Sequence, residues 1–172
     1  PVIVQSPAAG TIITTTTAVT LTASDAPGNS SSCTFDVFLS DTISPVVICP
    51  GNQNEFFDST CQFELPDYTG LLMVLDNCDP SPVVTQSPGI GTVIVGLTTI
   101  TLTSTDLSGN FSSCSFDVLL TDTIPPTVTC PGNQNEYFDT ACHFTLPDYT
   151  VLGIAADSCD ASPLITQTPV PG

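Results

Sequence analysis

The chain has 172 residues with no Lys, no Arg and 17 Asp and Glu, which gives a formal net charge of −17. Nucleic acids and anionic membranes are bound through cationic side chains, so this composition argues against both as partners. No apolar run is long enough to span a bilayer, and we expect no membrane insertion. Hydrophobic residues still make up 41% and charged residues only 10%. We therefore expect a folded chain with a solvated acidic surface.

An internal repeat organises the chain. The segment CPGNQNE at Cys49–Glu55 returns at Cys130–Glu136, and LPDYT at Leu65–Thr69 returns at Leu146–Thr150. The common offset of 81 residues is the period of the repeat, and it predicts three pieces: the end of one repeat at 1–43, a complete repeat at 44–124 and the start of another at 125–172. The segment is either a window on a longer array or a chain that joins others head to tail. Residues 163–172 duplicate residues 1–10, and this redundancy favours the window.

Short strands are predicted along the whole chain. A strand at 2–5 and another at 11–13 precede a hairpin at 17–41, whose tip is Asp25–Asn29. The complete repeat has strands at 46–49, 61–65, 82–86 and 92–95 and a second hairpin at 98–122, with its tip at Asp106–Asn110. The apolar run 71–75 is either a strand or a single helical turn. Seven short strands with frequent turns and no helical period indicate an all-β fold of the sandwich type.

Eight cysteines occur as four per repeat. This density is typical of a disulfide framework in a secreted or surface protein. No CxxC or Cys/His cluster is present, which disfavours zinc. Four cysteines in one repeat allow three pairings, and their spacing does not choose between them.

Several motifs together resemble the hyalin repeat (HYR) domain. They are DTISP at 41–45, the Cys49-Pro50 strand end, Asp76-Asn-Cys78, QSPGIGT at 86–92, TLTSTDLSGN at 101–110 and CSFDV at 114–118. The resemblance covers the whole chain. It implies tandem immunoglobulin-like β-sandwiches and an extracellular role in adhesion or scaffolding, as in surface proteins of bacteria.

The resemblance also implies a disulfide pairing. Cys49 is expected to pair with Cys114, which leaves Cys61 for Cys78 and, one period later, Cys142 for Cys159. Cys33 and Cys130 are then expected to pair outside this segment or between chains.

Two patterns suggest glycosylation. Asn29 and Asn110 begin Asn-x-Ser sequons at the hairpin tips, where the alternative is that Asn only supplies left-handed turn geometry. Four hydroxyls follow an Asp in a pattern similar to a bacterial O-glycosylation acceptor, although Asp-Thr is also common turn chemistry: Thr42, Ser59, Thr123 and Thr140.

No catalytic constellation is predicted, and we expect no enzyme. The only histidine, His143, lies at an outward strand position and is replaced by Gln62 one period earlier. We expect no cofactor. Asp41, Asp122, Asp76 and Asp79 could offer oxygen ligands to calcium, but no spaced ligand loop is present, and a solvated acidic face is the expectation.

The function expected from the sequence is an extracellular structural or adhesive array, a segment of a surface fibre or an adhesin stalk. Its partners are other copies or further repeats, and glycans. The alternative is a spacer or ligand-binding module of a larger surface enzyme or receptor.

Overall fold

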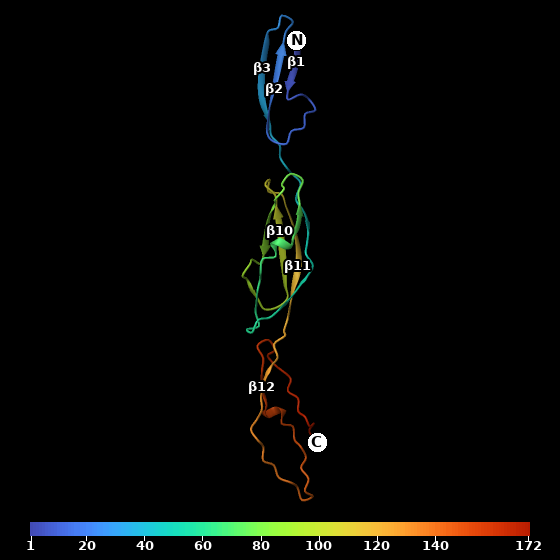
Figure 1. Ribbon diagram of the computed structural model, residues 1–172, viewed down its shortest axis with the longest axis vertical. Coiled ribbons are helices and arrows are strands. Elements are labelled where there is room, and N and C mark those ends of the chain that lie inside the picture. Colours follow the sequence, from blue (N-terminus) through green and yellow to red (C-terminus); the bar gives the residue numbers. More distant parts are fainter. The chain divides into compact units, whose positions relative to one another are not determined.

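A computed structural model describes residues 1–172, and it is built almost entirely of short β-strands (Figure 1). Two segments, η1 (Thr69–Leu71) and η2 (Thr150–Leu152), are single 3₁₀ turns. No helix is long and apolar enough to cross a membrane. The chain divides into two compact units: a first unit of 1–46, 75–83 and 105–112, and a second unit of 47–74, 84–104 and 113–172.

The first unit contains a three-stranded antiparallel sheet in the order β1-β2-β3. Its strands are β1 (Val2–Ser6), β2 (Thr17–Ser24) and β3 (Ser30–Val37). The tip between β2 and β3 closes because the Asp25 side chain accepts the backbone N–H of Asn29 at 2.8 Å, while Gly28 takes a φ of 95°. Glycine has no Cβ to clash in this left-handed region. The hairpin expected at 17–41 is thus present as two strands and a tight turn.

The complete repeat contributes a four-stranded sheet in the order β5-β11-β10-β8. These strands are β5 (Gln53–Phe56), β8 (Val83–Ser87), β10 (Thr98–Thr105) and β11 (Phe111–Thr121). β5 runs parallel to the end of β11, with Val118 opposite Gln53 and Thr121 opposite Phe56.

Two short pairs complete this repeat. The strands β4 (Val46–Ile48) and β7 (Met73–Leu75) pair with each other, as do β6 (Phe63–Glu64) and β9 (Val93–Ile94). The Asx residue Asp67 orders the chain between β6 and β7, since its carboxylate accepts the backbone N–H of Thr69 at 2.8 Å. The run 71–75 therefore holds the end of a helical turn followed by a strand.

The hydrophobic core combines both groups of strands. It consists of Leu65, Tyr68, Leu72, Ile94, Ile100, Leu102, Phe116 and Val118, with Val47 and Val74 packed against it. Tyr68 and Phe116 meet edge to face, with ring centroids 5.4 Å apart. Alternation along β10 and β11 explains this core. Ile100, Leu102, Phe116 and Val118 project to one side. The intervening polar residues project to the other side, where they pair across the strands as Thr99 with Asp117 and Thr101 with Ser115.

Residues 125–172, the last part of the second unit, contain only two short strands and one 3₁₀ turn. β12 (Thr127–Thr129) pairs with β13 (Ile154–Ala156), and η2 lies just before β13. Residues 163–172 contain no strand, although the same sequence positions form β8 in the complete repeat and β1 at the start of the chain.

Three local expectations differ from the structure. Residues 11–13 form no strand. β5 was not predicted, because its polar side chains do not show a strand pattern and the strand depends on pairing with the distant β11. The strand expected at 61–65 is shorter, since Cys61 adopts a left-handed backbone (φ 59°) instead of extended geometry.

Candidate functional site: the disulfides and the repeat junctions

Two disulfides are present. Cys49 bonds to Cys114 within the complete repeat, across a sequence separation of 65 residues. Their Cα atoms are 5.8 Å apart, within the usual range for a disulfide. The structure therefore contains the pair that the resemblance implied for this repeat. Both cysteines pack against the hydrophobic core.

The second disulfide corrects an expected pairing. Cys61 bonds to Cys159, 98 residues further along, and not to Cys78; Cys142 is consequently not bonded to Cys159. Cys61 and Cys159 lie in the second compact unit, whereas Cys78 lies in the first. The bond thus runs from the complete repeat to the repeat that follows it.

The loop that carries Cys61 is held by one carboxylate. Asp58 Oδ1 accepts the backbone N–H groups of Thr60 and Gln62, at 2.8 and 3.0 Å, and the backbone of Cys61 donates to the Asp58 carbonyl at 3.0 Å. The Thr60 hydroxyl and these N–H groups lower the pKa of Asp58. This closed loop turns Cys61 out of the strand direction, which explains why alternation failed to place it.

Four cysteines are free and exposed: Cys33, Cys78, Cys130 and Cys142. Cys33 and Cys130 are one period away from the bonded Cys114 and Cys49. Cys78 and Cys142 are one period away from the bonded Cys159 and Cys61. Each bonded position thus has a free counterpart in a neighbouring repeat.

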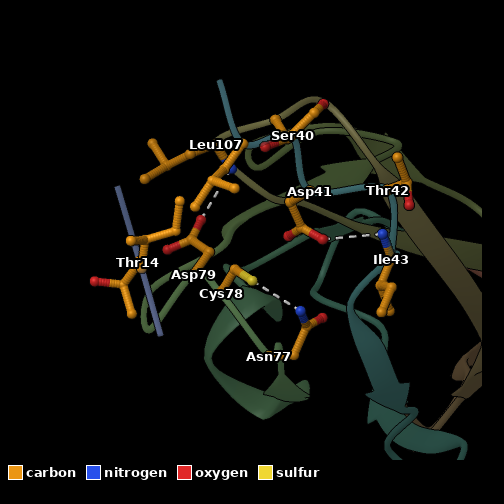
Figure 2. A pocket seen from close by; sticks show the side chains of 12 residues that line it. Thr14, Ser40, Asp41, Thr42, Ile43, Asn77, Cys78, Asp79 and Leu107 are labelled. Atoms are coloured by element: carbon orange, nitrogen blue, oxygen red, sulfur yellow. Dashed lines mark hydrogen bonds between the residues drawn. The ribbon is translucent and has the colours of Figure 1, made fainter. Parts of the chain in front are cut away.

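Cys78 lines a cavity of about 690 Å³ in the first unit (Figure 2). Four segments form its wall: residues 13–14, the linker at 39–43, the turn around Cys78, and the hairpin tip at Leu107. Asp79 Oδ2 accepts the backbone N–H of Leu107 at 3.0 Å, and Asn77 Nδ2 lies 2.8 Å from the Cys78 sulfur. These bonds hold the turn and the hairpin tip together beside the thiol.

The electrostatic surroundings of Cys78 are negative. Partial desolvation, followed by the charges of Asp41 and Asp76, raises the pKa of the Cys78 thiol. With no Lys or Arg in the chain, no cation offsets this effect. Near neutral pH Cys78 is therefore a protonated thiol rather than a thiolate.

The carboxylates of Asp41, Asp76 and Asp106 approach one another at this junction, with one oxygen of each within 4.8 Å of the others. Asp122, Asp157 and the sulfur of Cys159 form a similar group one period later, but that sulfur is in a disulfide. Backbone N–H groups bind only Oδ1 of these aspartates: Asp76 Oδ1 accepts from Cys78 and Asp79 at 2.9 and 2.8 Å, whereas Oδ2 of Asp76 and of Asp157 is buried without a hydrogen-bond partner. Of the four aspartates considered for calcium, the structure brings Asp41 and Asp76 together but places neither Asp122 nor Asp79 with them.

The four candidate O-glycosylation hydroxyls share one local geometry. The Asp before each of them accepts the backbone N–H two residues on, at 2.8–3.0 Å, in an Asx turn. The turn leaves the middle residue exposed in each case: Thr42, Ser59, Thr123 and Thr140. The Asp-Ser/Thr pattern is therefore both turn chemistry and a repeated presentation of a hydroxyl to solvent.

The two sequon asparagines differ. Asn29 is exposed, and its side-chain N–H₂ donates to Asp25 Oδ2 at 2.9 Å. Asn110 is half-buried and its N–H₂ donates twice, to Asp106 Oδ2 at 2.8 Å and to the Asp41 carbonyl at 3.2 Å. The left-handed residue of each tip is the glycine, not the asparagine. Both amide hydrogens of Asn110 are in use, so a glycan there would displace one hydrogen bond.

His143 is exposed on the counterpart of the Cys61 loop. Its backbone N–H donates to Asp139 Oδ1 at 2.8 Å, just as Gln62 donates to Asp58. This contact uses only the backbone, which explains why Gln and His are interchangeable at the position.

No protein-family model matches the chain, and no curated protein is significantly similar to it. The likeness to the hyalin repeat therefore rests on the sequence motifs alone. What the structure establishes is an all-β chain with two disulfides, Cys49–Cys114 and Cys61–Cys159; such bonds persist in oxidising, non-cytosolic compartments.

One feature of the junction was not predicted from the sequence. Cys159 is the counterpart of Cys78, so the repeat period fits a Cys61–Cys78 bond and a Cys61–Cys159 bond equally well. The only sequence signal is the position of Cys61 in an Asp-Ser-Thr-Cys loop, where Asx-turn chemistry competes with the strand pattern.

Proposed function

We propose that the chain is a segment of an extracellular structural array, in which disulfide-stapled, immunoglobulin-like repeats of the hyalin type form or decorate a surface fibre or adhesin stalk. Its action is mechanical. Each repeat is a stiff link, and the number of links sets the reach of the array. Glycans on the exposed hydroxyls would cover the apolar surface in water.

The observation that carries this proposal is the Cys61–Cys159 disulfide. It joins the complete repeat covalently to the next one, in addition to the peptide linker. Tension between these repeats is therefore carried by two covalent routes. A binding module with a flexible spacer has no need of the second route, whereas a tension-bearing link is strengthened by it.

The partial repeats give independent support. In sequence, residues 1–43 are the counterparts of β8 to β11, while residues 125–172 include the counterparts of β4 to β7. The first partial repeat leaves Phe35 49% exposed and the last leaves Phe144 40% exposed. These two side chains are the counterparts of Phe116 and Phe63, which lie in or against the core of the complete repeat, so the same repeat unit recurs on both sides of it.

The core of the complete repeat supports the immunoglobulin-like assignment. Its residues come from a four-stranded sheet and from two short strand pairs that contribute to one common cluster. One cluster shared by separate groups of strands is what a β-sandwich buries between its two layers, and this supports the proposed assignment.

Assembly of the full chain tests this function. We expect chains refolded with a glutathione redox couple to form threads, which electron microscopy would image and whose mass light scattering would measure. We also expect the backbone amides of the loop 139–143 and of the apolar residues in the partial repeats to become protected from hydrogen exchange. The matched control is the Phe35→Ser/Phe144→Ser variant. It should assemble less, because each partial repeat loses an apolar aromatic side chain. Oxidised chains that stay monomeric at high concentration would contradict the array.

A force measurement addresses the mechanical role. Full extension of a reduced repeat should release on the order of 280 Å, at up to about 3.5 Å per residue. The Cys49–Cys114 loop should withhold roughly 230 Å of this length when it is oxidised. Equal extension of oxidised and reduced chains would rule out stiff, stapled links.

A further inference from the structure

We propose that Asp41, Asp76 and Asp106 together bind one calcium ion, and that this ion fixes the linker at 39–43 to the complete repeat. The three aspartates come from three segments: the linker, the turn that holds Cys78, and the hairpin tip between β10 and β11. All three lie in the first compact unit. The proposal goes beyond the array described above, because it concerns a site within a single chain.

The spacing of the carboxylates suits one calcium ion. One oxygen of each aspartate lies within 4.8 Å of one oxygen of each of the other two. Calcium binds oxygen at about 2.3–2.6 Å, so two oxygens on the same ion are at most about 4.6–5.2 Å apart. The separations in this group are therefore within the span of a single ion.

No cationic side chain offsets these carboxylates. The chain has no Lys and no Arg, and its one histidine, His143, belongs to the other compact unit. Asp106 is only 6% exposed, and Asp41 and Asp76 are half-buried. Carboxylates this close, and partly removed from water, repel one another unless a proton or a cation lies between them. A proton removes one negative charge of the three, whereas a divalent cation offsets two.

A buried oxygen without a partner points to the position of the ion. Asp76 Oδ1 accepts two backbone N–H groups, whereas Asp76 Oδ2 is buried and has no hydrogen-bond partner. A buried carboxylate oxygen that has lost water without gaining another contact is costly. Oδ2 of Asp157, the counterpart of Asp76 one period later, is buried and unpartnered in the same way. The unpartnered oxygen thus recurs in two repeats, and a bound cation would supply its missing contact.

The ligand chemistry favours calcium. Carboxylate oxygens are the ligands that hard cations prefer. The cavity of about 690 Å³ reaches Asp41 (Figure 2), so water can complete the roughly six to eight oxygens that calcium takes. Magnesium demands a nearly ideal octahedron with shorter bonds, whereas calcium accepts irregular sets of ligands. Three carboxylates from three segments form such an irregular set.

Bound calcium would reinforce an existing contact of the linker. The Asn110 side chain already donates to the Asp41 carbonyl at 3.2 Å, which joins the linker to the hairpin tip. An ion shared by Asp41, Asp76 and Asp106 would add ionic contacts between the same segments. We therefore expect calcium to reduce the local opening of the linker and of the tip.

The group one period later provides an internal comparison. It contains only two carboxylates, those of Asp122 and Asp157, and Asp122 is exposed. Its third member is the sulfur of Cys159, which is in a disulfide and is a poor ligand for a hard cation. We therefore expect one calcium ion per chain at the first group and much weaker binding at the second.

Calorimetric titration with calcium chloride tests the site, with the oxidised full-length chain first freed of metal by a chelator and dialysis. We expect one site with a dissociation constant on the order of 10⁻⁴ M, as in extracellular calcium modules. Asp41→Asn and Asp76→Asn should each weaken binding at least about tenfold, since each removes one of three ligand charges. Asp122→Asn is the matched control, because it removes the same charge from the second group and should leave the affinity unchanged.

The substitutions preserve the local hydrogen bonds. Asn keeps an Oδ1 that accepts the backbone N–H groups now bound by Asp41 and Asp76, so both variants should fold. Recovery of the Cys49–Cys114 peptide under non-reducing conditions checks this. Hydrogen exchange gives a second readout: calcium should slow the exchange of amides at 41–43 and 106–110 in the unaltered chain and in Asp122→Asn, but not in Asp76→Asn.

Three outcomes would overturn the proposal. Binding weakened equally by Asp122→Asn and Asp76→Asn would mean that calcium is only attracted to an acidic surface. A titration that does not saturate below about 10 mM calcium would mean that no site exists. Magnesium that binds as tightly as calcium would refute the choice of metal.

The same samples separate this inference from the proposed function. Chains that bind calcium at this site but stay monomeric after oxidation would refute the array and leave the site. Threads that form from chains without saturable calcium binding would refute the site and leave the array.

Discussion

The hairpins β10–β11 and β2–β3 have related sequences and the same pairing but very different surroundings. Phe116 is 4% exposed, whereas its counterpart Phe35 is 49% exposed. Both hairpins still close with the same Asp-to-Asn contact at the tip. The comparison teaches that turn chemistry and strand pairing are local in this repeat, while burial depends on segments that come from earlier in the repeat. A hairpin alone is therefore only half of the fold.

The largest effect is expected from the disulfide of the complete repeat. Cys49→Ala/Cys114→Ala should lower its free energy of unfolding by about 4 kcal/mol, because the unfolded chain regains the freedom of a long loop. Urea unfolding, followed by Tyr68 fluorescence in a Tyr137→Phe/Tyr149→Phe background, measures this change. Cys33→Ala is the control and should leave the monomer unchanged. A similar decrease in the free energy of unfolding in both variants would mean that the disulfide of the complete repeat contributes nothing specific to its stability.

A core substitution sharpens the same contrast. Leu102 is fully buried, so Leu102→Ala should cost about 3 kcal/mol. Its counterpart Leu21 is only half-buried, and Leu21→Ala should cost less than about 1 kcal/mol in the isolated chain. Hydrogen exchange of the β10 and β2 amides reports the two effects separately. Equal costs would show that the first repeat buries its hairpin as well as the complete one does.

The hairpin tips should differ by a smaller amount. Asn110→Ala removes side-chain hydrogen bonds to Asp106 and to the Asp41 carbonyl, and we expect a loss of about 1 kcal/mol. Asn29→Ala removes only the contact with Asp25 from an exposed tip, and its effect should be a few tenths of a kcal/mol at most, about the scale of an exposed hydrogen bond. Thermal unfolding of both variants gives the comparison. A larger effect at Asn29 would be inconsistent with the linker contact of Asn110.

The smallest expected effect is a dependence on acid. Desolvation opposes ionisation of Asp106, but hydrogen bonds from Asn110, Ser108 and Gly109 outweigh it and lower the pKa of the carboxyl. A lowered pKa means that the carboxylate stabilises the fold above its unfolded pKa of about 3.9, and that this contribution is lost as the pH falls through the folded value.

Melting temperatures between neutral pH and pH 2 should therefore fall less steeply for Asp106→Asn than for the unaltered chain, since Asn does not titrate. Asp25→Asn is the matched variant at the exposed tip, where the Asn29 side chain lowers the pKa of Asp25. Parallel pH profiles for the unaltered chain and both variants would contradict the role of these carboxylates.

The sequence was sufficient to predict elements that depend on near neighbours. The alternation of Ile100 and Leu102 with threonines, and the Asp106–Asn110 turn, locate the second hairpin without reference to the rest of the chain. β5 could not be found in this way, since Gln53, Asn54 and Glu55 are polar and their strand exists because β11 offers its edge from far along the sequence.

The candidate site shows the same division. The Asx turns that present Thr42 and Thr123 follow from short motifs, and the structure contains them. The disulfide partner of Cys61 could not be predicted from the sequence. Cys78 and Cys159 occupy the same position in successive repeats, so the repeat pattern does not indicate which of them lies close to Cys61. The left-handed backbone of Cys61, which alternation alone would not predict, turns the sulfur away from the strand pattern.

The Cys61–Cys159 bond also bears on the resistance of the chain to proteolysis. A cut in the linker between Asp122 and Pro126 would separate the polypeptide into two pieces, yet Cys61 lies in one piece and Cys159 in the other. The nicked molecule would run as a single band on a gel until a reductant is added. Where every junction carries such a bond, hydrolysis of one peptide bond leaves the assembly connected. Separation then requires both cleavage of the linker and reduction of the disulfide at the same junction.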